Sequence, residues 1–265
     1  MNQTQSTNLP NQIVTTFNDY LYSEAERFNF WESGREWYGD RYNSLNDSYT
    51  YNFSVPNITA DSVKLVTKLA SRSTTNCNFT ISTSGISETI TLSSLPPSSY
   101  DYASLRTSTI YLENAPSSIV VNVNYGHAGS ITAEGFMDVL ELNVRRNLIM
   151  VGNSLKFQDI NSIGVGQVAE FQLTNAAQVS AIWDITNHHE VSSIDYTDLS
   201  STKTFVVNTD SLRQFIALTD NAGKVPIGYG QVMNQNLHAL GYADLILISP
   251  PLLLSHANDL AAFHR

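Results

Sequence analysis

His127 is the histidine whose surroundings are most typical of a catalytic base, because it stands in the stretch Asn124-Tyr-Gly-His-Ala-Gly-Ser130. A histidine held between small residues on a turn can present its imidazole to a substrate for proton transfer. The same stretch is also typical of a hairpin turn with an exposed histidine, and no obvious nucleophile accompanies it in the sequence. We therefore predict a turn between two strands of a β-sandwich, without a catalytic role for His127.

Cys77 is the single cysteine and the one possible thiol nucleophile. In an extended strand its side chain shares a face with Phe79 and Ile81, opposite Asn78 and Thr80. Cysteine is among the residue types most often fully buried, so we predict a structural cysteine in a core. One cysteine excludes an intrachain disulfide framework, and no Cys/His spacing is typical of a zinc site.

Metal-binding side chains are present but scattered. His188 and His189 are adjacent, so in a strand they point to opposite faces and rarely bind one ion together. Asp195, Asp198 and Asp210 are spaced too widely for an EF-hand loop, although a calcium site in a β-sandwich stays open. We assign no catalytic, cofactor-binding or metal-binding residue and expect no cofactor.

Residues 1–45 combine little regular pattern with many aromatic side chains, including Trp31 and Trp37. Two interpretations are open: a lead-in that lays these rings over a neighbouring sheet, or an aromatic platform that binds sugars. Glu32, Glu36 and Asp40 also fall here, but a carboxylate pair for glycoside cleavage depends on separation in space, which the sequence does not give.

Residues 46–145 predict an antiparallel β-sandwich. Apolar residues alternate with polar or small ones in short runs such as Tyr49-Tyr51-Phe53, Cys77-Phe79-Ile81 and Ile119-Val121-Val123, with turn-forming stretches between the runs. Short alternating strands at this spacing are typical of a jelly roll. Residues 146–235 predict a second β-rich layer, with a short helix over residues 210–218 on the spacing of Leu212, Phe215 and Ile216.

Residues 236–265 predict the opening strand and helix of an α/β domain. Leu245 to Ile248 form a continuous apolar run, which suits a strand buried in a parallel sheet. Ser249 can cap the following helix, whose apolar stripe includes Leu253, Ala257 and Leu260. A parallel strand needs a second strand beyond its crossover helix, and none follows here. The predicted fold class is therefore mainly β, a jelly-roll-like sandwich and a second β-rich layer that end in a truncated βα unit.

The composition restricts the possible partners. The formal net charge is −10 and charged residues make up 14% of the chain. Phosphate binding needs clustered lysine and arginine, so a nucleic-acid partner is not expected. The first residues lack a signal peptide's charged and apolar regions, and no apolar run approaches the roughly 20 residues of a membrane span.

Several stretches in order resemble the sortases of the bacterial type IX secretion system, in the gingipain-like cysteine peptidase family. The stretches are 33–42, 135–142, 146–148, 169–171, 179–186, 234–238 and 243–265. The resemblance implies a β-rich N-terminal region followed by a caspase-like peptidase domain, which begins at the last stretch. The family's catalytic histidine and cysteine lie further along, so none is carried over. Gly126-His127-Ala128 is similar to the family's Gly-His-Gly motif but has alanine in place of the second glycine. It also precedes the stretch at which the peptidase domain begins, so it is not that motif.

The resemblance also implies an outer-membrane β-barrel shuttle protein and secreted cargo as partners, at the surface of a Gram-negative bacterium. The chain itself is then a non-catalytic fragment, inactive alone, that supports the peptidase domain or docks a partner. The alternative is a carbohydrate-binding or adhesion sandwich that uses Trp31 and Trp37. A weaker third possibility is a hydrolase with a site of its own.

Overall fold

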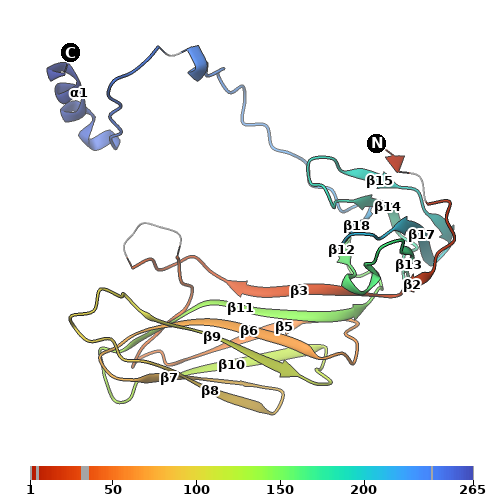
Figure 1. Cartoon of the computed structure of the whole chain (residues 1–265), viewed down its shortest axis with the longest axis horizontal. Helices are drawn as coiled ribbons and strands as arrows, with labels where there is room; N and C mark the ends of the chain where they lie inside the picture. Colours follow the sequence, from red (N-terminus) through yellow and green to blue (C-terminus); the bar gives the residue numbers. More distant parts are fainter. Residues whose placement is uncertain (1, 4–5, 31–35, 240, 265) are drawn as a thin grey trace. The chain divides into compact units, whose positions relative to one another are not determined.

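The computed structural model describes residues 2–3, 6–30, 36–239 and 241–264. It divides into two compact units, residues 1–223 and residues 224–265, which we call the packed unit and the terminal segment. The ribbon in Figure 1 shows the packed unit as β structure, whereas α1 lies in the terminal segment. Each unit is described by itself below.

The first half of the packed unit is a sandwich of two antiparallel sheets. The front sheet has the order β3-β11-β6-β9, with the short β4 also paired to β11, and the back sheet has the order β5-β10-β7-β8. The strands are β3 (Thr16–Glu24), β4 (Arg41–Tyr42), β5 (Ser48–Ser54), β6 (Val63–Arg72), β7 (Cys77–Thr83), β8 (Ile86–Leu92), β9 (Ser104–Leu112), β10 (Ser118–Gly126) and β11 (Glu134–Asn147).

The strand order is that of a jelly roll. Apart from β4, strands that follow one another in the chain mostly lie in opposite sheets, and β11 returns to pair with β3 and β6. This arrangement of two interleaved four-stranded sheets, within the part of the chain that the structure describes, is the eight-stranded jelly-roll topology. The predicted sandwich and its jelly-roll type are confirmed.

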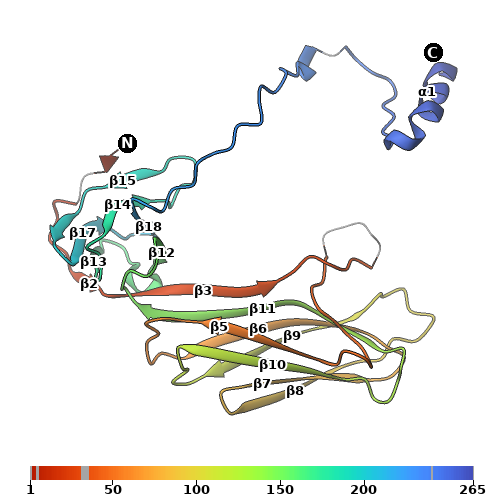
Figure 2. The same ribbon diagram turned by 180° about the vertical axis from the view of Figure 1, so that it is seen from behind.

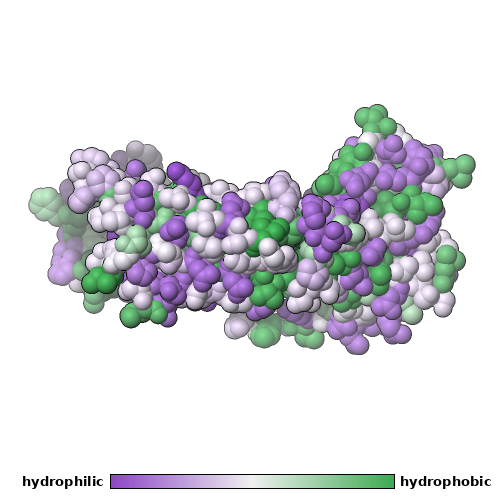
Figure 3. All heavy atoms as spheres, turned by 90° about the horizontal axis from the view of Figure 1, so that it is seen from below, coloured by the Kyte–Doolittle hydropathy of each residue, from purple (hydrophilic) through white to green (hydrophobic). Residues whose placement is uncertain are grey.

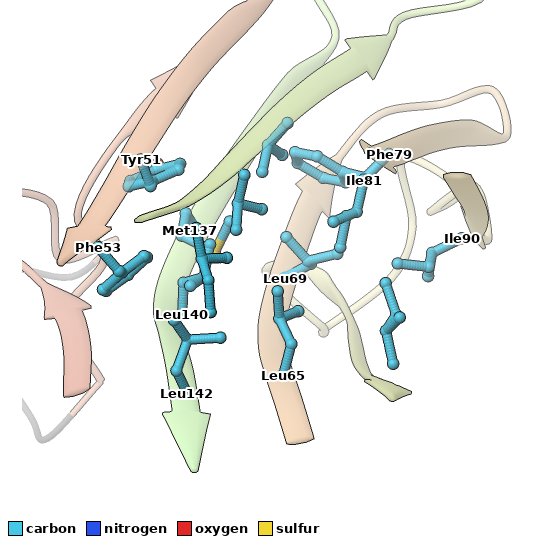
Figure 4. Packing of buried hydrophobic residues seen from close by; sticks show 14 of the residues in the cluster. Tyr51, Phe53, Leu65, Leu69, Phe79, Ile81, Ile90, Met137, Leu140 and Leu142 are labelled. Carbon is cyan, nitrogen blue, oxygen red and sulfur yellow. The ribbon is translucent and has the colours of Figure 1, made fainter. Parts of the chain in front are cut away.

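Alternating burial explains how these residues form the sandwich. β10 alternates exposed and buried residues along its whole length, and every second residue of β7 is buried. Each strand therefore turns one apolar face inward, where residues of both sheets interdigitate. Figure 4 shows this packing with Tyr51 and Phe53 from β5 and Met137, Leu140 and Leu142 from β11.

The second half of the packed unit is the predicted second β-rich layer. One sheet has the order β1-β15-β14-β18-β12 and the other has the order β16-β17-β13-β2. Its elements are β1 (Asn2–Gln3), β2 (Gln12–Val14), β12 (Ser154–Gln158), η1 (Ile160–Ser162), β13 (Val168–Leu173), β14 (Val179–Asp184), β15 (Ser192–Ile194), β16 (Thr197–Leu199), β17 (Thr202–Asn208) and β18 (Gln214–Thr219). Its core holds four mutually packed rings, Phe157, Phe171, Phe205 and Phe215.

Strand β3 belongs to both halves. It pairs with β11 along its whole length and meets β12 where Asn18 is the partner of Gln158, so one sheet runs from β1 to β9. Figure 2 shows β3 running from the second sandwich along the jelly roll. The residues expected as an irregular lead-in therefore supply β1, β2, β3 and β4. The division of the chain at residues 45, 145 and 235 stays a prediction.

The helix predicted over residues 210–218 is wrong. Gln214–Thr219 form β18, which pairs with β12 and with β14. Phe215 and Ala217 alternate into the core, while Ile216 between them is only half-buried. Two neighbouring strands offer this segment backbone partners on both sides, and that tertiary pairing outweighs the helix-like spacing of three apolar residues.

The terminal segment contains η2 (Leu237–Ala239), η3 (Pro251–Leu253) and α1 (Leu254–Phe263). The predicted helix is confirmed, but the strand predicted at Leu245 to Ile248 is not formed. A strand needs a neighbouring strand for its backbone hydrogen bonds, and no other described part of the segment supplies one. Ser249 also does not cap the helix, because its hydroxyl donates to the carbonyl of Pro250 at 3.1 Å.

Candidate functional site

Cys77 is buried in the jelly-roll core, as the sequence predicts. It is 1% exposed, and its Sγ donates a hydrogen bond to the backbone carbonyl of Thr75 at 3.5 Å. Burial, and then hydrogen bonding with Cys77, raise the pKa of the neighbouring Tyr125 hydroxyl. Tyr125 also shares a hydrogen bond of 2.8 Å with Ser71. A thiol closed in by this cluster is not presented to a substrate.

His127 lies in the turn between β10 and β11, also as predicted. The turn is closed by the Ser130 N–H, which donates to the His127 carbonyl at 2.9 Å, and Ala128 and Gly129 both have positive φ. The Nδ1 atom is buried and has no hydrogen-bond partner among the described residues. A general base of a nucleophile dyad needs both a nucleophile and a group that orients its ring. His127 has no orienting hydrogen bond at this nitrogen.

His188 and His189 are exposed in a turn that Asn187 organises, because its side chain accepts from the His189 N–H at 3.1 Å. Asp198 is paired with Lys203 at 2.5 Å, and Asp210 accepts from the Gly166 N–H at 2.7 Å. Within the described ranges, no group of three or more His, Cys, Asp or Glu side chains could hold a metal ion.

The aromatic residues near the start of the chain mostly pack inward. Phe28, Phe30 and Tyr38 cover Phe136 of β11, with the Phe30 and Tyr38 rings stacked at 4.8 Å. This is the arrangement of rings laid over a neighbouring sheet. Trp37 is 37% exposed. Trp31 and Glu32 lie outside the described residues, so a sugar platform around Trp31 and Trp37 stays a prediction.

The remaining carboxylates of that stretch, Glu36 and Asp40, lie in different surroundings. Asp40 forms an ion pair with Arg27 at 2.7 Å and accepts from the Tyr51 hydroxyl at 2.8 Å. The Tyr51 contact ties the Asp40 carboxylate to β5 of the jelly roll, and the Arg27 contact lies within the connection between β3 and β4. Glu36 lies on the exposed connection before it. Asp40 is therefore a structural anchor of this connection.

Two arginines at the end of β11 bind side chains at the junction of the two sandwiches. Arg145 bonds to Asp159 at 2.8 Å, to the Asn18 side chain at 3.2 Å and to the Thr16 hydroxyl at 2.5 Å. Arg146 bonds to Asp19 at 2.5 Å and stacks its guanidinium over the Phe17 ring, 5.2 Å from the centroid. In the sequence, these two residues stood out only as the one pair of adjacent arginine or lysine residues in an acidic chain.

A cavity of about 220 Å³, which we call the corner cavity, opens beside this junction. It is lined by residues of β3, β12 and β18 and by the residue after β14: Asn18, Asp19, Tyr20, Lys156, Phe157, Gln158, Ile185, Gln214 and Phe215. No sequence motif marked it, because its lining comes from four separate stretches. Figure 3 shows one face of the molecule, over which hydrophilic and hydrophobic residues are interspersed.

The terminal segment offers a different surface. None of its side chains that the structure describes is buried, and Leu245, Ile246 and Leu254 are each more than half exposed. A hollow of about 720 Å³ separates the stretch 242–249 from α1. None of the helices in the described part of the chain is long and apolar enough to cross a membrane.

No family model and no curated protein matches the sequence. Among solved structures, dimeric latent PorU from Porphyromonas gingivalis matches 98% of this chain with a TM-score of 0.75 and 18% sequence identity. The chain has a PorU-like fold. It covers 25% of the PorU chain, so it corresponds to about a quarter of that protein. The resemblance read from the sequence is thereby confirmed for the fold.

A second solved structure is the CBM36-1 domain of a multidomain xylanase from the hindgut metagenome of Trinervitermes trinervoides. It matches with a TM-score of 0.30 and 12% identity, over 47% of this chain and 95% of that domain. A match at this level supports no argument about fold or function. Of these two structures, PorU alone supports an argument about the fold.

Proposed function

We propose that the chain is the non-catalytic, β-rich N-terminal region of a cell-surface cysteine peptidase or sortase. The parent protein would process the C-terminal sorting domains of proteins secreted by a type IX system. The observation that carries the proposal is the PorU-like fold, which extends over 98% of the chain. PorU is a member of the gingipain-like family that the ordered sequence stretches resemble.

The role we propose for the packed unit is to support the peptidase domain. Its one thiol is buried and His127 lacks an orienting hydrogen bond, so the reacting cysteine and histidine would come from the rest of the parent protein. A nucleophilic cysteine is accessible and activated by a neighbouring base. Two sandwiches joined by the shared strand β3 and by the Arg145–Asp159 ion pair would form a rigid support for such a domain.

The terminal segment would be the first part of that peptidase domain. Its apolar residues are exposed in the stretch Leu245 to Ile248 and on α1, where Leu260 and Phe263 are 47% and 83% exposed. Exposed apolar area of this kind marks a surface that another part of a protein covers. In our proposal, parallel strands of the parent's α/β domain cover it and complete the βα unit.

The partners and the location follow from the same proposal. An outer-membrane β-barrel shuttle protein would hold the parent at the cell surface, and secreted cargo would be its substrate. The low charge content and the many exposed Ser, Thr and Asn side chains of this chain are compatible with a surface protein.

The proposal is tested by incubating the purified chain with a reporter protein that carries a type IX sorting domain. We expect no cleavage, because no reactive thiol is accessible. Cleavage that disappears in the His127→Ala or Cys77→Ala variant would contradict the proposal. The matched control is His189→Ala, which changes an exposed turn histidine far from Cys77 in the sequence.

Location is tested by tagging the parent protein in its own cell and labelling intact cells with a reagent that does not cross membranes. We expect labelling of the tagged protein at the cell surface. Protection of the tag in intact cells, with labelling after lysis, would contradict the proposed location.

A further inference from the structure

The corner cavity lies on a continuous outer face of the sheet that links the two sandwiches. Gln158 of β12 is the strand partner of Asn18 in β3 and of Gln214 in β18, so these three side chains share one side of the sheet. The opposite side carries the core residues Phe157 and Phe215. The cavity is therefore built on the solvent face of the sheet, above a packed aromatic core.

Exposed aromatic rings stand along this face on both sides of the cavity. Tyr20 and Tyr22 follow each other at i and i+2 on β3, with rings 5.5 Å apart and exposures of 47% and 58%. On the other side, Trp183 of β14 is 42% exposed. It is the strand partner of Ile216 on β18, and Ile216 is the strand partner of Lys156 on β12. Trp183 therefore lies on the same face of the sheet as Lys156, which lines the cavity. Three strand spacings separate β14 from β3, about 14 Å.

The polar side chains of the cavity are held by neighbouring residues, but some of their hydrogen-bonding groups have no partner among the described residues. Gln214 donates to the Gln158 side-chain oxygen at 2.7 Å, which leaves the Gln158 amide nitrogen without a partner among the described residues. Lys156 forms no ion pair with any residue that the structure describes. Asn18 and Asp19 are held by Arg145 and Arg146, so that end of the cavity is rigid.

The Tyr20 hydroxyl is affected by a neighbouring carboxylate. Partial burial, and then a hydrogen bond with the Glu141 carboxylate, raise the pKa of Tyr20 to about 12, so its hydroxyl stays protonated at neutral pH. Glu141 is on β11, beside β3 in the front sheet. About half of the Tyr20 side chain faces solvent.

We propose that this face binds an oligosaccharide, with one sugar ring in the corner cavity against Tyr20 and the chain extending toward Trp183. Sugar hydroxyls both donate and accept hydrogen bonds, as do the amides of Gln158 and Gln214. Aromatic rings provide apolar faces with few rotatable bonds. The cavity volume of about 220 Å³ is below the range of roughly 300–1,000 Å³ of most small-molecule sites, which fits a single ring.

The proposed site differs from the aromatic platform expected at Trp31 and Trp37, and it goes beyond the support role proposed above. Glycan binding by the packed unit does not depend on peptidase activity. The two proposals can therefore fail separately.

The test is isothermal titration of the whole chain with soluble hexasaccharides of glucose, mannose, xylose, N-acetylglucosamine and galacturonate. We expect at least one of them to bind, and the Tyr20→Ala and Trp183→Ala variants each to weaken its Kd about tenfold, which corresponds to the loss of one aromatic contact. Tyr20→Phe keeps the ring and should bind within about threefold of the parent chain, a difference below one stacking contact.

Tyr111→Ala is the matched control. Tyr111 lies on the same face of the front sheet, in register with Tyr20 across β11 and β6, but outside the cavity. It is 58% exposed, against 47% for Tyr20. We expect its Kd to match that of the parent chain. The proposal is overturned if none of the five sugars binds at millimolar concentration, or if Tyr111→Ala weakens binding as much as Tyr20→Ala.

Discussion

The packed unit and the terminal segment contain similar apolar runs with opposite outcomes. In β10, Ile119, Val121 and Val123 are all fully buried between neighbours from β5 and β7. In the terminal segment, Ile246 and Ile248 are 75% and 96% exposed and form no strand. Local sequence is apolar in both cases, so the difference lies in the partners that distant parts of the chain supply. An apolar run becomes a buried strand only where those partners are present.

The largest expected difference between the two units comes from replacing one phenylalanine in each with alanine and measuring the free energy of unfolding. Phe79 is fully buried against Tyr42 and Tyr125, whereas Phe263 is 83% exposed. Phe79→Ala should lower the free energy of unfolding by about 3–5 kcal/mol, because it leaves a cavity in a close-packed core. Phe263→Ala should change it by less than about 0.5 kcal/mol. Urea unfolding followed by fluorescence measures both.

An equal loss of stability in the two variants would break the comparison, since the terminal segment would then contribute to the same cooperative core. A second substitution perturbs the same core without removing an aromatic ring. A Cβ added at Gly135 would lie 2.6 Å from the Phe79 ring and 2.8 Å from the Tyr125 ring. Gly135→Ala should therefore destabilise by overpacking, by about 1–3 kcal/mol.

The next effect concerns the junction inside the packed unit. Arg146→Ala removes a guanidinium that is 9% exposed and leaves Asp19 without its cation, so we expect a loss of about 2–3 kcal/mol in unfolding free energy. Arg27→Ala breaks an ion pair whose arginine is 61% exposed and should cost less than about 0.5 kcal/mol. Equal losses in calorimetric unfolding would show that the junction carries no special stability.

Two aspartates of the packed unit should respond to pH with opposite signs. Burial alone would raise the pKa of Asp184, but hydrogen bonds from Thr186 and Arg213 outweigh it and lower the pKa. Asp184 therefore stabilises the fold above its unfolded pKa of about 3.9, and this stability is lost as pH falls through the lower folded pKa. In Asp184→Asn the Tm should fall at neutral pH and change less with acid.

Asp138 gives the contrast. Burial, with Glu24, Glu26 and Glu36 nearby, raises its pKa against the opposing effect of Lys68. The charged form of Asp138 is less favourable in the folded state than in the unfolded state. Ionised Asp138 therefore lowers the free energy of unfolding at neutral pH, and this loss is relieved as pH falls through the raised folded pKa. Asp138→Asn should raise the Tm at neutral pH. A fall in Tm at neutral pH would show that the Asp138 charge is stabilising.

The smallest effect should come from removing the terminal segment. Deletion of residues 241–265 removes exposed apolar side chains and no strand of the packed unit, so the Tm should stay within about 1 °C. Solubility should increase, because an exposed apolar run is an aggregation hazard. The matched control is deletion of residues 16–24, which removes β3 and should unfold the chain. Unfolding by the first deletion would show that the segment belongs to the core.

Strands with one apolar and one polar face could be predicted from sequence. The alternation in β7 and β10 identified the sandwich and the burial of Cys77. β3 was missed because aromatic residues occupy both of its faces, with Phe17 inward and Tyr20 and Tyr22 outward. Alternation of polar and apolar residues disappears in such a strand, although its backbone pairing is extensive.

The corner cavity could not be predicted from the sequence for a different reason. Its residues lie near positions 20, 157, 185 and 214, and only the order of strands in the sheet brings them together. β18 itself was predicted as a helix from Phe215 and Ile216. A site made by sheet order has no local spacing to detect, whereas the negative prediction for His127 rested on local residues in one turn.

Strand β3 has a consequence for how the protein is made. It leaves the ribosome before its partners β11 and Gln158 have been synthesised, and the neighbouring β2 likewise precedes its partner β13. The jelly roll cannot close before β11 has been synthesised, and the second sandwich cannot close before β18 has been synthesised. Contacts between such distant positions give a high contact order and slow folding. The nascent chain therefore exposes Phe17 and its apolar neighbours until these partner strands have been synthesised, which makes this strand a natural site for chaperone binding.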